Sequence, residues 1–138
     1  AIENVVEVTE ADIRLARARF PLPMANPLLA LAAQLGVIKR AADADGTITT
    51  TLAAARIGPA QFATMPGEPL PKVGLAAKDL MDVQFRFFFG LADDELGYLL
   101  HAEAVGDERY AYEQRMSINP NAVPLLMERL GALIEITE

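Results

Sequence analysis

The segment that most restricts the fold is an aromatic run in the second half of the chain. Residues 83–89 read Val-Gln-Phe-Arg-Phe-Phe-Phe, which begins in apolar–polar alternation and ends in consecutive phenylalanines. Alternation favours a β-strand, and a continuous apolar end is typical of a strand covered on both faces. We therefore expect a central strand here, ended by Gly90, with its phenylalanines in the core.

The rest of the chain alternates between strand-like and helix-like segments that glycine and proline separate. β-Branched residues and alternation predict strands over residues 2–8, 12–20, 47–57 and 61–65, and a short extended segment near residue 99. Apolar positions at helical spacing predict helices over residues 28–35, 72–81 and 122–134. This order favours a layered α/β or α+β fold with a mixed sheet and about three helices.

Local signals mark the ends of two of these elements. Asn26 followed by Pro27 is typical of a helix N-cap and first helical position, and Gly36 is typical of a helix end. The helix between them is apolar almost all round, so we expect it to be buried. Pro21 and Pro23 should end the preceding strand, because proline cannot donate to a ladder.

Composition narrows the possible functions. A chain of 138 residues is one domain or part of a larger one. Its net charge of −7 argues against a nucleic-acid partner, because phosphate binding requires a basic face. The absence of cysteine excludes disulfides and thiolate sites. With one histidine and one serine, this chain alone provides neither a histidine-rich metal site nor a range of hydrolytic triads.

The acidic excess lies in the last third of the chain. Residues 91–138 hold ten acids and three bases, whereas residues 1–46 and 47–90 are close to neutral. The simplest interpretation is a solvated outer face. Within this third, residues 101–118 are predicted to be a loop.

Neither a targeting signal nor a membrane span is expected. The chain opens Ala1-Ile2-Glu3-Asn4, without a basic segment followed by an apolar one. Its longest apolar stretch, residues 27–37, is shorter than the roughly 20 residues that a membrane-spanning helix needs. Because the first residue is not methionine, we expect a processed product or a piece of a longer protein.

Glu68 is the first candidate for a functional residue. It lies in Pro66-Gly67-Glu68-Pro69, a loop that proline and glycine make rigid, just after a predicted strand. Such a carboxylate can bind zinc or act as a base. A purely structural alternative is a carboxylate that the dipole at a helix N-terminus favours.

Four further positions also have both a chemical and a structural interpretation. The acidic triplet Asp93-Asp94-Glu95 could supply oxygen ligands to a divalent cation, or it could be a solvated turn. Tyr98 could donate, accept or bind a metal, or it could be a half-buried structural tyrosine. His101 and Ser117 each stand alone, which favours a loop or capping histidine and a structural hydroxyl.

Three segments together resemble one protein family. Residues 57–69 (Ile-Gly-Pro-Ala-Gln-Phe-Ala-Thr-Met-Pro-Gly-Glu-Pro) are similar to its IG…PGE strand and loop. Residues 90–99 (Gly-Leu-Ala-Asp-Asp-Glu-Leu-Gly-Tyr-Leu) are similar to its GLANDELGYI segment, and Tyr112-Glu113 with the following Asn-Pro-rich stretch and terminal helix resembles its closing segment. The family comprises the neutral/alkaline non-lysosomal ceramidases and their relatives, and the resemblance covers roughly residues 55–135.

The resemblance implies a zinc-dependent amidase, in which a zinc-bound water attacks an amide carbonyl. In that family two histidines, a glutamate and a tyrosine hold the metal, and Glu68 and Tyr98 fall on the glutamate and the tyrosine. The histidines belong to the family's earlier half, which this chain does not contain. His101 matches no ligand position, and Asp93 replaces the usual asparagine.

The chain would then be the C-terminal portion of a hydrolase whose missing N-terminal portion is its partner. We expect zinc in the intact protein, no tight zinc binding by this chain, and no activity of the chain alone. We also expect Glu68 and Tyr98 to lie close together, facing a common cleft at strand ends.

A non-catalytic α/β binding or assembly module is the alternative. The lone histidine and serine favour it for the isolated chain, whereas the matched motifs favour a hydrolase. In both cases the aromatic run and the helix over residues 28–35 supply more apolar surface than the other helices can cover. We therefore expect a homo-oligomer, in the form of a two-fold dimer.

Overall fold

A four-stranded sheet forms the centre of the computed structural model, which describes residues 7, 9, 11–38 and 42–138. Its strands, in spatial order, are β1 (Ile13–Pro23), β2 (Thr47–Ile57), β3 (Ala60–Thr64) and β5 (Phe85–Phe89). β1, β2 and β3 pair antiparallel in turn, whereas β5 pairs parallel to β3. The sheet is therefore mixed, as the sequence predicts.

A second, parallel sheet joins two short strands, β4 (Glu68–Pro69) and β6 (Tyr98–Leu99). The described residues also form four α-helices and two short 3₁₀ helices. These are α1 (Pro27–Gln34), α2 (Pro71–Asp79), α3 (Ala111–Arg115), α4 (Val123–Thr137), η2 (Ala102–Ala104) and η3 (Glu108–Tyr110). The predicted mixed α/β fold is confirmed, with one α-helix more than expected.

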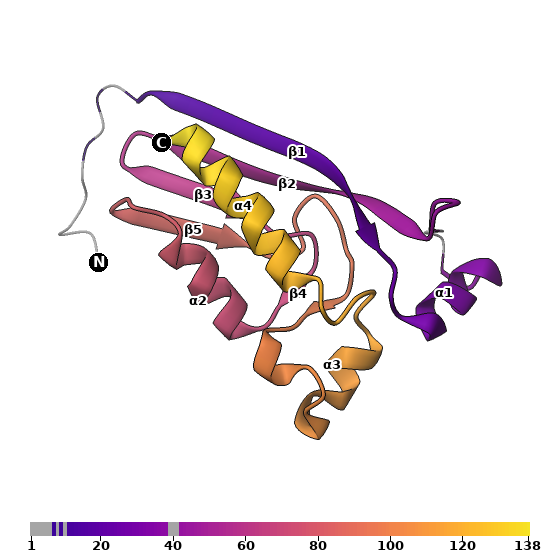
Figure 1. Ribbon diagram of the computed structural model, residues 1–138. Helices are drawn as coiled ribbons and strands as arrows, with labels where there is room; N and C mark the ends of the chain where they lie inside the picture. The colour runs from indigo at the N-terminus through magenta and orange to yellow at the C-terminus, as the bar shows by residue number, and fades with distance from the viewer. Residues whose placement is uncertain (1–6, 8, 10, 39–41) are drawn as a thin grey trace.

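The hydrophobic core lies between the large sheet and the two helices α2 and α4, which Figure 1 shows on the same side of the sheet. Leu126, Leu130 and Ile134 recur every fourth residue along α4 and are fully buried. They belong to one cluster with Leu22 of β1 and Leu52 of β2. Helical spacing and strand alternation thus direct these side chains into one shared layer.

Proline does not end β1, contrary to the expectation. The strand continues through Pro21 and Pro23, which pair with Thr49 and Thr47 of β2. β1 lies at the edge of the sheet, where proline is tolerated because an N–H that faces solvent is not needed for the ladder. The two prolines share one orientation, and Leu22 between them is fully buried in the core.

The expected burial of α1 is also wrong. None of its residues is buried, and the side chains of Leu28 and Leu31 are more than half exposed. Figure 1 places α1 beyond the end of the long β1–β2 pair, away from α2 and α4, so of its side chains Leu29 alone packs, partly buried, against the described core. The predicted cap is confirmed, since the Asn26 side-chain oxygen accepts hydrogen bonds from the backbone N–H groups of Leu28 and Leu29.

The aromatic run forms an edge strand rather than the expected central one. β5 pairs with β3 alone among the described strands. Phe88 packs against the core beside α2, whereas Phe87 and Phe89 are 43% and 48% exposed. The run is therefore not covered on both faces, because α2 and α4 lie on the same side of the sheet.

Three remaining expectations concern other segments. Residues 101–118 are not simply a loop, since they include η2, η3 and α3. The strand expected over residues 2–8 lies, apart from Glu7, outside the described residues. Among the described helices, none is both long and apolar enough to cross a membrane.

Replacing Leu130 with alanine should strongly destabilise the protein. Leu130 is fully buried in the core, and a Leu→Ala change at such a position costs about 2–5 kcal/mol of unfolding free energy. Ile136 on the same helix is 68% exposed, so Ile136→Ala should change this free energy by about 0.5 kcal/mol or less. Urea denaturation measures both effects, and equal losses would contradict the described orientation of α4.

Candidate functional site

Glu68 and Tyr98 lie side by side, paired directly in the small parallel sheet. Their strands follow β3 and β5, so both residues lie beyond the carboxyl ends of two parallel strands. That edge is where open α/β sheets form their binding sites. Paired residues of a ladder point to the same face. The expected proximity of Glu68 and Tyr98 is therefore confirmed, while metal binding by them stays a prediction.

Backbone hydrogen bonds hold this pair in register. The Glu68 N–H donates to the Gly97 carbonyl at 2.9 Å, and the Leu70 N–H donates to the Leu99 carbonyl at 3.0 Å. On its other side, the Tyr98 N–H donates to the Met116 carbonyl at 3.3 Å. Tyr98 is thus fixed between two backbone segments.

Two glycines permit this close approach. A Cβ on Gly67 would lie 2.6 Å from the Gly97 carbonyl oxygen, and one on Gly97 would lie 1.8 Å from the Met116 carbonyl oxygen. Gly97 also has a φ of +72°, a conformation that other residues rarely adopt. Leu91 has a φ of 53° and donates its N–H to the Gly67 carbonyl at 2.7 Å, so backbone strain is concentrated beside the site.

Asn26 anchors the segment around Met116, which lies on the other side of β6 from β4. While its side-chain oxygen caps α1, its Nδ2 donates to the carbonyls of Arg115 (3.0 Å) and Ser117 (2.8 Å). Ser117 in turn forms a backbone bridge with Gly97. A residue that sequence reasoning recognised as a helix cap therefore also positions the segment that holds Tyr98.

The environment of Tyr98 is apolar and negatively charged. Burial raises the pKa of its phenol most, and Glu68, Tyr112 and Glu113 raise it further. The ring of Tyr112 packs edge-on against that of Tyr98, with centroids 5.9 Å apart. A phenol and a carboxylate side by side, with a second carboxylate nearby, favour a cation over an anion as a ligand.

The acidic triplet does not form an oxygen cluster. The Asp93 carboxylate accepts a hydrogen bond from Thr64 Oγ1 at 2.9 Å and lies 3.4 Å from Arg17 Nη2. The Asp94 carboxylate accepts from Thr50 Oγ1 at 2.9 Å. These bonds tie the loop after β5 to the strands of the large sheet. Asp93 and Asp94 are therefore structural anchors, whereas Glu95 is exposed, as the solvated-turn interpretation expects, and the described residues form no metal-holding group here.

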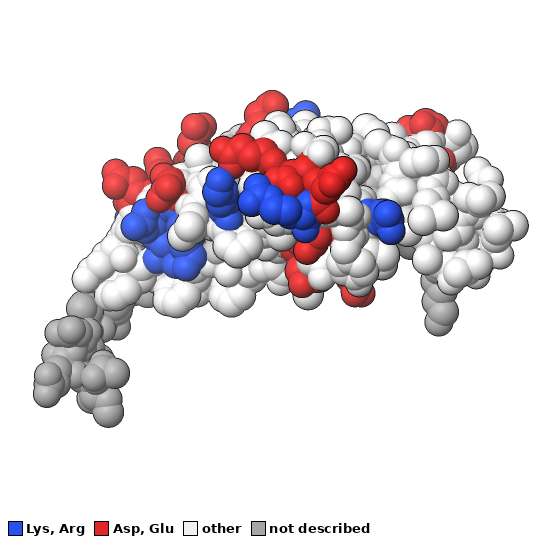
Figure 2. Space-filling view, turned by 90° about the horizontal axis from the view of Figure 1, so that it is seen from below, with Lys and Arg blue, Asp and Glu red and all other residues white. Residues whose placement is uncertain are grey.

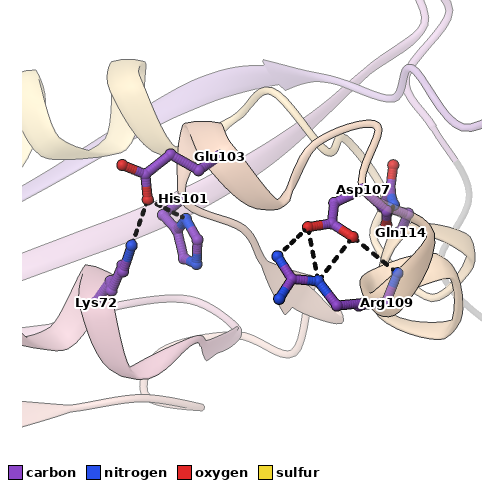
Figure 3. A network of polar contacts seen from close by, with 6 residues as sticks. All are labelled: Lys72, His101, Glu103, Asp107, Arg109 and Gln114. Atoms are coloured by element: carbon purple, nitrogen blue, oxygen red, sulfur yellow. Dashed lines mark hydrogen bonds and ion pairs between the residues drawn. The ribbon is translucent and has the colours of Figure 1, made fainter.

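His101 belongs to a separate polar network, shown in Figure 3. Its Nδ1 lies 3.4 Å from a Glu103 carboxylate oxygen, and its ring packs edge-on against Tyr110. Glu103 also pairs with Lys72 at the start of α2. This contact lowers the pKa of the Glu103 carboxyl and raises that of the Lys72 ammonium. His101 precedes η2 without capping it through its side chain, and its buried Nδ1 makes no hydrogen bond to the described residues.

Figure 3 also shows a turn built on Asp107, Arg109 and Gln114, which the sequence analysis did not predict. The Asp107 carboxylate accepts hydrogen bonds from Nε and Nη2 of Arg109, the shortest at 2.6 Å, and from the Arg109 backbone N–H at 2.9 Å. These bonds lower the pKa of Asp107 to about 2. Gln114 closes the turn by donating to the Asp107 carbonyl and accepting from the Gly106 N–H. The only sequence signal for this ion pair is that an aspartate lies two residues before an arginine.

Charges of both signs are interleaved on the face seen in Figure 2. Ion pairs such as Lys72–Glu103 and Arg86–Asp79 join opposite charges locally. Most acids of the last third of the chain are exposed, which agrees with the predicted solvated face. Exposed pairs of this kind contribute little to stability, because water screens them.

A cavity of about 460 Å³ lies next to the site. It is lined mainly by apolar side chains, among them Leu29, Ile48 and Leu96, and by Gly97, which directly precedes Tyr98. Its lining does not include Glu68 or Tyr98, and the Glu68 side chain is exposed. The two candidate ligands therefore lie beside this cavity rather than within it.

Within the described part of the chain, no group of three or more histidine, cysteine, aspartate or glutamate residues is arranged to hold a metal ion. Glu68 and Tyr98 are thus two oxygen donors, fewer than the three or four protein ligands of usual zinc sites. Comparison with protein-family models, with curated proteins and with solved structures finds no match to this chain.

Gly97→Ala should disrupt the small sheet, whereas Gly106→Ala should be tolerated. Both glycines have positive φ, so alanine costs roughly 1–2 kcal/mol of backbone strain at either position. A Cβ at position 97 would also collide with the Met116 carbonyl, whereas nothing lies within 4 Å at position 106. Urea denaturation should show a clearly larger loss for Gly97→Ala, and equal losses would contradict the packing described.

The Asp107 carboxyl should titrate at a pH of about 2. Because its folded-state pKa lies below the ordinary 3.8, ionised Asp107 stabilises the fold at higher pH, and this contribution is lost as pH falls toward 2. Arg109→Ala should raise the midpoint toward 3.8, as followed by carboxyl NMR. Arg86→Ala, which removes the ion pair with Asp79, should leave it unchanged. A midpoint insensitive to Arg109→Ala would refute the assigned cause.

Proposed function

We propose that this chain is the C-terminal portion of a ceramidase-like, zinc-dependent amide hydrolase, to which it supplies Glu68 and Tyr98 as metal ligands. The observation that carries the proposal is their direct pairing in the small sheet, although 30 positions of the sequence separate them. The two motifs that resemble the family, residues 57–69 and 90–99, come together in space at this pair. If the two motifs resembled the family only by chance, there would be no reason for Glu68 and Tyr98 to pair.

The residues present fit the metal. A carboxylate is a common zinc ligand, and a phenol joins it here in an environment with negative neighbours. Without a cation, burial and Glu68 hold the Tyr98 phenol in its protonated form. When bound, zinc would act as a Lewis acid on the amide carbonyl and would lower the pKa of a ligand phenol.

In this proposal the chain positions two metal ligands, Glu68 and Tyr98, and the missing N-terminal portion supplies the others. Gly67 and Gly97 fix the backbone of each ligand residue, and the Met116 carbonyl holds β6 from the other side. In the family the remaining ligands are two histidines from the earlier half of the protein. The single histidine of this chain matches no ligand position of the family, so the two histidine ligands would come from outside the chain.

The alternative is a non-catalytic α/β binding or assembly module. The exposed apolar side chains on the helix-free side of the sheet favour it, because such surfaces usually recruit a partner. A screen of amide and ester substrates with a longer protein that includes the upstream segment separates the two. Hydrolysis that Glu68→Gln abolishes supports the hydrolase, and the lack of any hydrolysis favours the module.

Zinc should lower the titration midpoint of Tyr98 in the 138-residue chain. In a Tyr110→Phe/Tyr112→Phe background Tyr98 is the sole tyrosine, so ultraviolet absorbance of tyrosinate reports on it alone. Without metal, its pKa lies above the ordinary 10.0, so folding stability should fall as pH rises from that value through the folded-state pKa. With zinc chloride the midpoint should move down, because a bound cation favours the phenolate.

Glu68→Gln should abolish the zinc effect, whereas Glu103→Gln, a matched change in the network of Figure 3, should preserve it. Because the chain offers two ligands, zinc binding should be weak and lost on dialysis. A midpoint that zinc does not move would refute the assignment of Tyr98. Stoichiometric zinc retained after dialysis would instead show that further residues of this chain, His101 first, are ligands.

A further inference from the structure

Among the described elements, no helix lies on one of the two faces of the large sheet. Strand pairing places Leu15, Ala55, Phe62 and Phe87 in one row across β1, β2, β3 and β5, with side chains on the same face. The neighbouring row, shifted by one residue, contains Ala16, Ala54, Ala63 and Phe88, which belong to the core beneath α2 and α4. The first row therefore faces away from both helices, which Figure 1 shows on one side of the sheet.

This helix-free side is apolar, and we name it the open face. Its large apolar members are Ile13, Leu15, Ile57, Phe62, Phe87 and Phe89. Ile13 and Leu15 are 69% and 71% exposed. The Phe62 ring stacks on those of Phe87 and Phe89, with centroids 4.9 and 6.3 Å apart. Stacked rings on paired strands are already ordered, so a partner that covers them costs little side-chain entropy.

The size of the open face matches one side of a dimer interface. Its six large side chains together expose on the order of 600 Å² of apolar surface, close to the roughly 800 Å² that each partner buries in a standard interface. The largest apolar patch on a typical monomeric protein covers roughly 300–600 Å², so the open face lies at the upper end of that range. The open face thus has the area of an interface.

The border of the open face is polar. One row beyond Leu15 the same face carries Arg17, and the following outward position of β1 is Arg19. Arg17 pairs with Asp93 at 3.4 Å, and Thr64 Oγ1 donates to the same carboxylate at 2.9 Å. An apolar centre with a charged rim is the usual anatomy of a protein–protein interface.

We propose that the open face, centred on Leu15, Phe62 and Phe87, is the surface through which two copies of this chain associate about a two-fold axis. Two sheets of the same right-handed twist pack well face to face, about 10 Å apart. A two-fold axis brings the same patch of each copy together, which satisfies both patches at once. This proposal is independent of zinc binding, because its residues lie outside β4 and β6.

Sedimentation equilibrium of the 138-residue chain across roughly 1–100 μM tests the proposal, and we expect a dimer. Leu15→Gln combined with Phe87→Gln should weaken dimerisation at least about tenfold. Leu28→Gln combined with Leu31→Gln removes exposed apolar surface of the same chemistry from α1 and should leave dimerisation unchanged. Urea denaturation of each variant verifies that it remains folded.

A second measurement does not depend on apolar-to-polar substitutions. The chain lacks cysteine, so Ala55→Cys places a single thiol at the centre of the open face, between Leu15 and Phe62. A short bis-maleimide should join two such chains, whereas Ala76→Cys on the exposed side of α2 should remain monomeric after the same treatment. A chain that is still monomeric at about 100 μM, or a dimer weakened only by the α1 variant, would overturn the proposal.

Discussion

Close contact between backbone segments at two glycines is the constraint on which the rest of the site depends. Gly67 and Gly97 let β4, β6 and the segment around Met116 approach more closely than any side chain would allow. The large sheet makes the contact possible, because parallel β3 and β5 end at the same edge and deliver both loops there. Glu68 and Tyr98 each directly follow one of these glycines, so packing requirements and ligand positions are coupled.

The candidate ligand pair and the open face have one feature in common: each is incomplete within this chain. The large sheet has described helices on one side and none on the other, and the proposed zinc site has two oxygen donors where three or four ligands are usual. In our two proposals additional protein supplies what is missing: another copy of the chain covers the open face, and the histidine-bearing portion of a hydrolase completes the ligands. Because α2 and α4 cover one side of the large sheet, additional protein can bind on the helix-free side or at the β4–β6 edge.

The spacing of apolar residues correctly predicted the elements that have one buried and one exposed face. The spacing of Leu126, Leu130 and Ile134 identified α4, because one face of this helix is buried and the other is exposed. The same reasoning failed for α1, in which no residue is fully buried, and for β5, whose phenylalanines lie partly in solvent. Pairing of Glu68 with Tyr98 came from family resemblance, since contact between distant loops leaves no local pattern. Asp107 and Arg109 were missed because each looks like an ordinary surface charge.

Asn26 links the beginning of the chain to its end, which has a consequence for how the protein is made. Its side chain bonds to the carbonyls of Arg115 and Ser117, 89 and 91 positions later. During synthesis, Asn26 leaves the ribosome long before these partners exist. The segment that holds β6 therefore cannot be locked in place by Asn26 until residues 115–117 have been synthesised. Since contacts between such distant residues form slowly, we expect the segment that holds Tyr98 to be fixed later than the local β2–β3 hairpin.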